Sequence, residues 1–198
     1  MDLALGALLL TGGASRRMGT PKALLPVGDT TLAEQIAGLL RLVADPVVEA
    51  GPGFTTLPAI PDRLPRAGPL AALANAWSQL ETLAARPAAA LVVACDLPWL
   101  SQPLLAALAD PAGRECGPSD AAVVPELDGH LQPLCARYPA AALDTAVALA
   151  GTGARSLHRL LDAIEFRVLP GEPFRQALAD VDSAEDLARL MNPAAGRP

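Results

Sequence analysis

Residues 3–22 read LALGALLLTGGASRRMGTPK, and this stretch holds the strongest structural signal in the chain. The apolar run Leu3–Leu10 is typical of a buried strand, and the paired glycines at 12 and 13 end it. No acidic residue occurs in residues 3–28. Three cations do occur there: Arg16, Arg17 and Lys22. Because glycines let backbone N–H groups approach an anion and cations neutralise its charge, the stretch predicts a phosphate-binding loop after a buried strand.

Outward from this strand, apolar runs alternate with helical patterns along the 198 residues. Further strands are expected at 46–50, 57–60, 89–95, 121–125, 132–138 and 165–169. Helices are expected at 30–43, 69–85, 102–109, 140–150, 155–163 and 183–191. This order predicts an α/β fold, a Rossmann-like three-layer α/β/α sandwich with a mainly parallel central sheet. The length suits a single domain, residues 1–191, followed by a flexible C-terminal tail, residues 192–198.

Bulk composition argues against several classes of function. A formal net charge of −6 disfavours a general nucleic-acid or anionic-membrane surface, and aromatic residues make up only 3% of the chain. Three widely spaced cysteines form neither a disulfide framework nor a zinc motif. We therefore expect no nucleic-acid partner and no membrane partner. We also expect a cytoplasmic location, because the sequence contains no signal peptide and no stretch that spans a bilayer.

The spacing of the glycines excludes two familiar phosphate loops. A Walker loop requires lysine directly after its last glycine, whereas Thr20 and Pro21 separate Gly19 from Lys22. The dinucleotide pattern GxGxxG fails because the glycines at 12 and 13 are adjacent. The loop therefore belongs to another class of phosphate site.

A second candidate is Asp96, which directly follows the expected strand 89–95. In an open α/β sheet, ligands bind beyond the carboxyl ends of the strands, so Asp96 and Gly12 would face the same crevice. A carboxylate in that position suits a ligand of Mg²⁺.

Several motifs in order resemble those of the molybdenum cofactor guanylyltransferases and their nucleotidyltransferase relatives. They are GGASRRMGTPKALL at 12–25, PDRLP at 61–65, GPLAAL at 68–73, CDLP at 95–98, QPLCARY at 132–138 and GARSL at 153–157. The resemblance implies a fold like that of the nucleotide-diphospho-sugar transferases. It also implies Mg²⁺-dependent transfer of GMP from GTP to the terminal phosphate of molybdopterin, with release of pyrophosphate. Molybdoenzymes or cofactor-insertion proteins are the further partners that it suggests.

The resemblance also implies roles for individual residues. Lys22, Arg17 and Asp96 would be catalytic, and Asp96 would bind Mg²⁺. Asp182, at a position that departs from the family pattern, would add a second carboxylate to the metal site. Arg155 and Ser156 would reach the phosphate of the pterin substrate. The nucleotide would be bound by Leu10, Gly12, Gly13, Arg16, Arg17, Lys22, Asp62, Gly68, Pro69 and Leu70. Among these, the Asp62 carboxylate can accept hydrogen bonds from guanine N1–H and the exocyclic amine.

One segment departs from the family pattern and leaves alternatives open. Asp180 and Asp182 stand where the family has two asparagines, and this acidic version also resembles the cytidylyltransferase branch. The paired glycines at 12 and 13 and the motif at 68–71 favour guanine. The alternatives are a CTP-dependent molybdopterin cytidylyltransferase, another NTP transferase acting on a phosphorylated small molecule, and a non-catalytic cofactor-binding adaptor.

Overall fold

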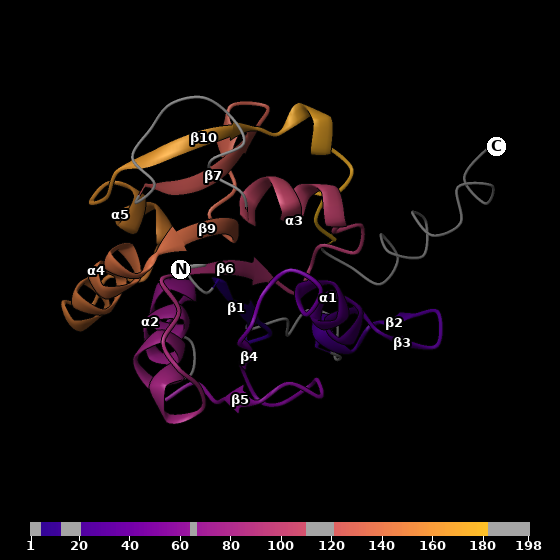
Figure 1. The fold of residues 1–198 in the computed structure, drawn as a ribbon, viewed down its shortest axis with the longest axis horizontal. Helices are drawn as coiled ribbons and strands as arrows, with labels where there is room; N and C mark the ends of the chain where they lie inside the picture. The colour runs from indigo at the N-terminus through magenta and orange to yellow at the C-terminus, as the bar shows by residue number, and fades with distance from the viewer. Residues whose placement is uncertain (1–4, 13–20, 64–66, 110–120, 182–198) are drawn as a thin grey trace.

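The computed structural model describes residues 5–12, 21–63, 67–109 and 121–181 (Figure 1). Its large sheet has the strand order β10-β7-β9-β6-β1-β4-β5, with β8 paired to β7. These strands are β1 Leu5–Leu10, β4 Val47–Ala50, β5 Ala59–Ile60, β6 Ala89–Ala94, β7 Ala122–Leu127, β8 His130–Leu131, β9 Cys135–Pro139 and β10 Phe166–Pro170. β9 runs antiparallel to β6 and β7, and β8 runs antiparallel to β7, whereas the other described pairs of this sheet are parallel. The predicted α/β fold with a mainly parallel sheet is confirmed.

β1 lies in the middle of this sheet and sets the position of the loops around it. Leu10 is level with the last residues of β4 and β6, so the three strands end together. Cys95 N donates to Leu10 O at 3.1 Å, and Thr11 N donates to Ala50 O at 3.1 Å. The loops that begin at Thr11, Gly51 and Cys95 therefore start side by side at the carboxyl edge.

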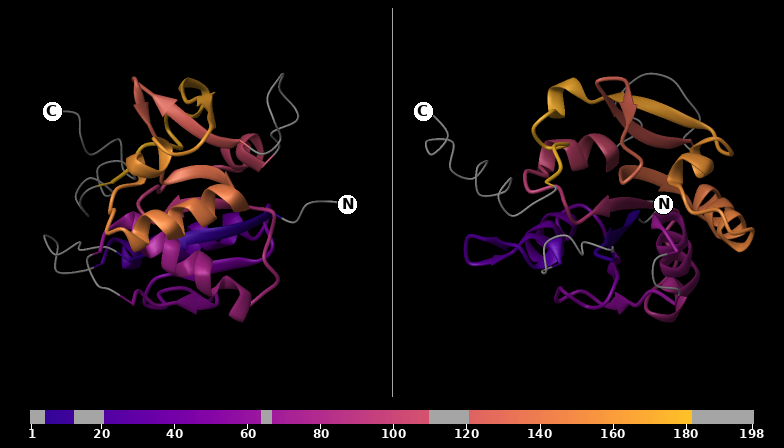
Figure 2. Two further views of the ribbon diagram at one scale, coloured as in Figure 1. Left: turned by 90° about the vertical axis from the view of Figure 1, so that its left-hand side faces the viewer. Right: turned by 180° about the vertical axis from the view of Figure 1, so that it is seen from behind.

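Helices cover both faces of the sheet, which gives the predicted three layers (Figures 1 and 2). They are α1 Leu32–Leu40, α2 Pro69–Gln79, α3 Gln102–Ala109, α4 Ala140–Gly151 and α5 Leu157–Leu161. Side chains alternate across a strand, so Leu9 of β1 joins the core with α1 and α3, whereas Leu8 joins the core with α2, α4 and α5. Burial on both faces explains why β1 is apolar without interruption.

The structure differs from the prediction at the start of α1. Residues 30 and 31, expected to be helical, form β3 (Thr30–Thr31), which pairs with β2 (Pro26–Val27). Gly28, with a φ of 57°, allows the turn between these strands. Thr31 is the N-cap of α1, and its side chain accepts from Glu34 N at 3.3 Å. Thr31 therefore caps the helix, which begins one residue later at Leu32.

The boundaries of β9, α2 and α5 also differ from the prediction. β9 begins only at Cys135, because Pro133 has no N–H for the ladder and Cys135 N bonds Gln132 O at 3.0 Å. α2 ends at Gln79 and continues as the 3₁₀ helix η2 (Leu80–Thr82). α5 is shorter than the expected helix 155–163 at both ends.

The C-terminal predictions fall on residues 182–198, which lie outside the described residues. The expected helix at 183–191, the tail at 192–198 and the division at residue 191 therefore stay predictions. None of the described helices is long and apolar enough to cross a bilayer.

Candidate functional site

The predicted phosphate-binding loop begins where β1 ends. Leu10 is 5% exposed, so its side chain belongs to the core and any ligand contact there involves its backbone. Gly12 N donates to Ala50 O at 3.4 Å. A hydrogen bond of this length is weak, which leaves the amide available to a stronger acceptor. Three predicted members of the loop lie outside the described residues: Gly13, Arg16 and Arg17.

Lys22 and Asp96 lie together at this edge of the sheet. Lys22 is the first residue of η1 (Lys22–Leu24), and Asp96 follows β6 closely in the chain. Lys22 Nζ is 3.8 Å from Asp96 Oδ2, and the two side chains are 17% and 29% exposed. This ion pair is long, and both side chains are partly exposed. The structure thus brings together the predicted phosphate-binding lysine and the predicted metal ligand.

The C-terminal part of the described chain returns to the same place. Val181 N donates to Asp96 O at 3.0 Å. The backbone hydrogen bond holds the residue before Asp182 against the end of β6. Asp182 itself lies outside the described residues, so its predicted role as a metal ligand stays a prediction.

Asp62 reaches the start of the phosphate-binding loop from the segment after β5. A Cβ added to Gly12 would lie 2.6 Å from Asp62 Oδ2, so the carboxylate lies directly against the backbone of Gly12. Asp62 Oδ1 is buried and has no hydrogen-bond partner among the described residues. Burial raises the pKa of the Asp62 carboxyl above its ordinary value. A carboxylate in this environment gains most from a ligand that donates hydrogen bonds to it.

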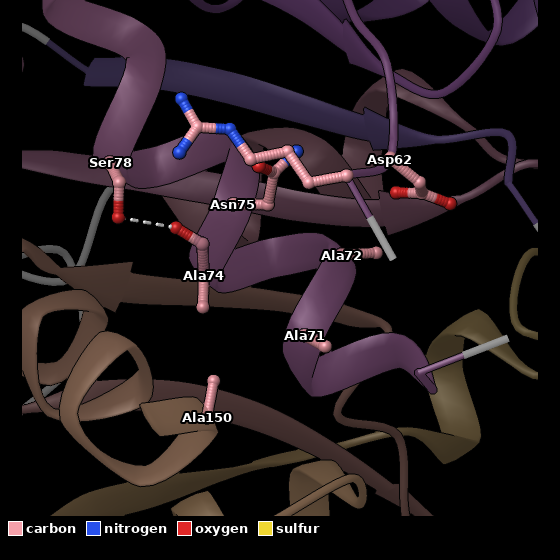
Figure 3. A pocket seen from close by; sticks show the side chains of 8 residues that line it. Asp62, Ala71, Ala72, Ala74, Asn75, Ser78 and Ala150 are labelled. Carbon is pink, nitrogen blue, oxygen red and sulfur yellow. Dashed lines mark hydrogen bonds between the residues drawn. The ribbon is translucent and has the colours of Figure 1, made fainter. Parts of the chain in front are cut away.

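A pocket of about 200 Å³ opens beside Asp62, between α2 and the end of α4 (Figure 3). It is lined by Asp62, Arg63, Ala71, Ala72, Ala74, Asn75, Ser78 and Ala150. Asn75 Nδ2 donates to Pro61 O at 3.0 Å, and Gln79 Nε2 donates to Asn75 Oδ1 at 2.7 Å, which fixes the Asn75 amide. Typical ligand pockets measure roughly 300–1,000 Å³. The pocket therefore suits one part of a ligand, next to the Asp62 carboxylate.

The N-terminus of α2 packs against the segment before α5. Gly68 has a φ of 95°, and a Cβ added there would lie 2.7 Å from Arg155 O. Leu70 N donates to the same carbonyl at 3.2 Å. Two predicted groups are thereby brought together, the motif Gly68-Pro69-Leu70 and Arg155. The Ser156 side chain has a structural role as the N-cap of α5.

Glu49 of β4 is a polar residue beside this site that the sequence reasoning missed. Its exposed fraction is 0%, and Thr11 Oγ1 donates to Glu49 Oε1 at 2.6 Å. The sequence did hold a signal, because residue 49 is the one charged position in the apolar run 47–50. A carboxylate inside a buried strand is rare unless the fold supplies partners for it.

Comparisons with known proteins identify the relatives of this chain. Residues 7–167 match the family model of the MobA-like NTP transferase domain. A Mycobacterium tuberculosis (strain ATCC 25618 / H37Rv) protein named probable molybdenum cofactor guanylyltransferase is 36% identical over 198 residues, covering 96% of this chain and 94% of the relative.

Solved structures share the fold. Molybdopterin-guanine dinucleotide biosynthesis protein A from Archaeoglobus fulgidus gives a TM-score of 0.73 at 20% identity, covering 97% of this chain and 100% of that one. The 2-C-methyl-D-erythritol 4-phosphate cytidylyltransferase from Thermus thermophilus gives 0.66 at 21% identity, covering 96% and 98%. The likeness to these structures concerns the fold.

Proposed function

Because this chain belongs to the MobA-like NTP transferase family, we propose that it transfers GMP from GTP to the terminal phosphate of molybdopterin. The chain is a nucleotidyltransferase of molybdenum cofactor biosynthesis, like the relatives that it matches. Within this proposal, the transfer chemistry is supported by the 3.8 Å pair of Lys22 and Asp96 at the sheet edge where the glycine loop begins.

The proposed reaction needs no nucleophilic side chain. A phosphate oxygen of molybdopterin forms a bond to the α-phosphorus of GTP, and the bond from that phosphorus to the bridging oxygen of the β-phosphate breaks. Pyrophosphate leaves with the electron pair of this bond. Since the attacking phosphate is already ionised at neutral pH, the enzyme acts by positioning the reactants and neutralising charge.

Cations and backbone amides of the first loop would hold the triphosphate. Lys22 would stabilise the charge that develops at the α-phosphate. The further proposed contacts along the triphosphate are Leu10, Gly12, Gly13, Arg16 and Arg17. Arg17 joins Lys22 and Asp96 as a proposed catalytic residue.

Asp96 suits the proposed Mg²⁺ site by its chemistry. Mg²⁺ is usually bound by one or two carboxylates, together with phosphate oxygens and waters. The Asp96 carboxylate is partly exposed, and the Val181–Asp96 hydrogen bond supports Asp182 as the second carboxylate. When bound, Mg²⁺ would offset the negative charge of the phosphate oxygens.

Guanine recognition is proposed for Asp62 and the N-terminus of α2. The buried Oδ1 of Asp62, which has no partner in the described part of the chain, supports this role, because guanine offers two donors on one edge. Gly68, Pro69 and Leu70 would form the adjoining wall. Arg155 packs on that wall and, with Ser156, would reach the phosphate of molybdopterin. Molybdoenzymes or cofactor-insertion proteins would receive the product.

The test is pyrophosphate release by the purified protein with Mg²⁺, molybdopterin and one nucleoside triphosphate at a time. We expect release with GTP that depends on molybdopterin. Lys22→Ala should keep the circular dichroism spectrum and lower turnover by about 10²–10³-fold, the usual effect of removing one transition-state donor. Arg159→Ala is the matched control, because this cation of α5 is 70% exposed.

Each other outcome has a distinct meaning. Undiminished turnover by Lys22→Ala would overturn the proposed role of the loop. Release with CTP in place of GTP would assign the cytidylyltransferase activity, and release with a different phosphorylated acceptor would assign another NTP transferase. Nucleotide binding without any pyrophosphate release would identify a non-catalytic adaptor.

A further inference from the structure

Glu49 is a fully buried carboxylate that accepts five hydrogen bonds. Its Oε1 accepts from Thr11 Oγ1 at 2.6 Å, from Gly53 N at 2.9 Å and from Phe54 N at 2.8 Å. Its Oε2 accepts from Thr55 N at 2.9 Å and from Thr55 Oγ1 at 2.7 Å. Three consecutive backbone amides and two hydroxyls thus surround this one carboxylate.

This environment keeps the buried Glu49 carboxyl ionised. Burial raises its pKa, but the hydrogen bonds from Thr11, Phe54 and Thr55 together lower it by more, so that the pKa lies below its ordinary value. Hydrogen bonds to the charged form of an acid favour that form. A neutral or shorter side chain at position 49 would leave inward-facing donors without an acceptor, which is costly in a buried place.

Two carboxylates accept hydrogen bonds from the loop 51–58 that joins β4 to β5, and we call them the anchors of this loop. Glu49 bonds its first half, and Glu34 of α1 bonds its second half. Glu34 accepts from Thr56 N at 2.8 Å and from Thr56 Oγ1 at 2.6 Å. Its side chain is 26% exposed and pairs with Arg41, so this contact lies on the surface. Of the two anchors, Glu49 is the one whose contacts extend to the start of the phosphate-binding loop, through Thr11.

Glu49 is connected to both halves of the proposed nucleotide site. Thr11 directly precedes Gly12, and the backbone of Gly12 lies against the Asp62 carboxylate. A Cβ added to Gly51 would collide with Thr11 Oγ1, so the two loops are packed together as well as hydrogen-bonded. Gly51 N also donates to the last residue of β5 at 3.0 Å, and Asp62 follows shortly after that strand. A displacement at Glu49 would therefore reach Gly12 and Asp62 by separate routes.

We propose that Glu49 is a positioning residue that sets the spacing between Gly12 and Asp62 across the proposed guanine pocket. The inference rests on the proposed function, since it takes guanine as the base and Asp62 as its partner. Glu49 acts through Thr11 and the loop 51–58, and it does not touch the nucleotide. Contacts to the base are made equally in the ground state and the transition state, so their loss raises KM and leaves kcat.

The test compares Glu49→Gln with Glu34→Gln at the other anchor of the same loop. We expect Glu49→Gln to raise the KM for GTP by about tenfold and to change kcat by less than about threefold. Glu34→Gln should leave both constants within about twofold of wild type, because its contact is at the surface. A KM equal to wild type with only a smaller active fraction would overturn the proposal, since that result describes a residue needed for stability alone.

Selectivity between GTP and ITP gives a readout that does not depend on how much protein is folded. ITP lacks the exocyclic amine of guanine, so a correctly placed Asp62 loses one hydrogen bond with ITP. The ratio of kcat/KM for GTP to kcat/KM for ITP should fall toward one in Glu49→Gln. A ratio equal to that of wild type would contradict the proposal.

Thr11→Val keeps the proposal testable if Glu49→Gln does not fold, and Glu49→Ala with added formate gives a second readout. Thr11→Val removes a single hydrogen bond and should raise the KM for GTP by about threefold to tenfold. In Glu49→Ala, formate should bind in the space left by the carboxylate, where the backbone amides and hydroxyls can donate to it. Added formate should then lower the KM for GTP, whereas neutral formamide should not. An unchanged KM in Thr11→Val together with no response to formate would overturn the inference.

Asp62→Asn separates this inference from the proposed function. If Asp62→Asn keeps the wild-type preference for GTP over ITP, the assignment of guanine to Asp62 fails. If that preference is lost in Asp62→Asn but kept in Glu49→Gln, only the positioning role of Glu49 fails.

Discussion

Glu49 and Asp62 are two carboxylates beside the same glycine loop, and their environments are opposite. Glu49 accepts five hydrogen bonds from the protein, whereas Asp62 Oδ1 is buried without a partner among the described residues. The pKa of Glu49 lies below its ordinary value, and that of Asp62 lies above it. The first carboxylate is satisfied by the fold. The second has an acceptor left for a ligand.

This difference separates two kinds of buried polar group. A carboxylate with all its donors supplied by the chain stabilises the arrangement of the segments that supply them. A carboxylate without donors costs stability until a ligand brings them, and such groups mark candidate binding sites. Substitutions at the two positions should therefore differ in sign as well as in size.

The largest expected effect is the loss of stability in Glu49→Ala. We expect its free energy of unfolding to fall by about 3–5 kcal/mol, because several buried donors lose their acceptor at once. Glu34→Ala should cost about 1 kcal/mol or less, since its contacts are near the surface. Urea unfolding of the three proteins measures the difference. Equal losses at the two positions would remove the distinction between the two anchors of the loop.

A smaller effect, on affinity and not on stability, is expected for Asp62→Asn. The amide keeps the shape of the carboxylate but presents an NH₂ group toward the donors of guanine. We expect the dissociation constant for GTP to rise by about 30-fold, which corresponds to about 2 kcal/mol. Calorimetric titration with GTP and Mg²⁺ measures it, and CTP serves as the comparison ligand. GTP affinity equal to wild type would mean that Asp62 does not face the base.

The contact between Gly12 and Asp62 should appear as a coupling between the two positions. Gly12→Ala adds a methyl group 2.6 Å from Asp62 Oδ2, so the carboxylate has to move. We expect a cost of about 1–2 kcal/mol, in the usual range for overpacking. In an Asp62→Ser background the same substitution should cost little, because the shorter side chain leaves room. A double-mutant cycle by urea unfolding tests this, and additive losses would mean that the two residues do not restrain each other.

The sequence allowed the fold and the position of two loops at the carboxyl edge of the sheet to be predicted, because those signals are local. The apolar run before the paired glycines identified β1, and the carboxylate after the run 89–95 identified Asp96. The rule that parallel strands end at one edge predicted that Gly12 and Asp96 face the same crevice, and the loops that begin at Thr11 and Cys95 do start side by side there. The hairpin of β2 and β3 was missed although Gly28-Asp29 is a recognised turn signal, because the helical spacing that follows it was extended too far.

The environments of Glu49 and Asp62 could not be predicted in the same way. Thr11 and Glu49 are 38 residues apart, and neither segment contains a pattern that predicts their contact. The buried state of Asp62 depends on its packing against Gly12, which lies far from it in the sequence. A single sequence shows which residue types are present. The satisfaction of a buried acceptor is a property of how several segments pack, and it appears only in the structure.

The smallest expected effect is the pH dependence of stability, and it has opposite signs at the two carboxylates. The pKa of Glu49 is lowered from 4.5, so its stabilising contribution is present above that pH and is lost as pH falls through the lower, folded-state pKa. The pKa of Asp62 is raised from 3.8, so its ionisation costs stability as pH rises through the higher, folded-state pKa.

Asp62→Asn should therefore unfold like wild type below pH 3.8 and be more stable at neutral pH, by at most about 1 kcal/mol. Glu49→Gln should be less stable than wild type at neutral pH, and this deficit should shrink as the solution is acidified. Urea midpoints of the three proteins across this pH range measure both slopes. Slopes of the same sign would mean that the unliganded protein satisfies Asp62 as it satisfies Glu49.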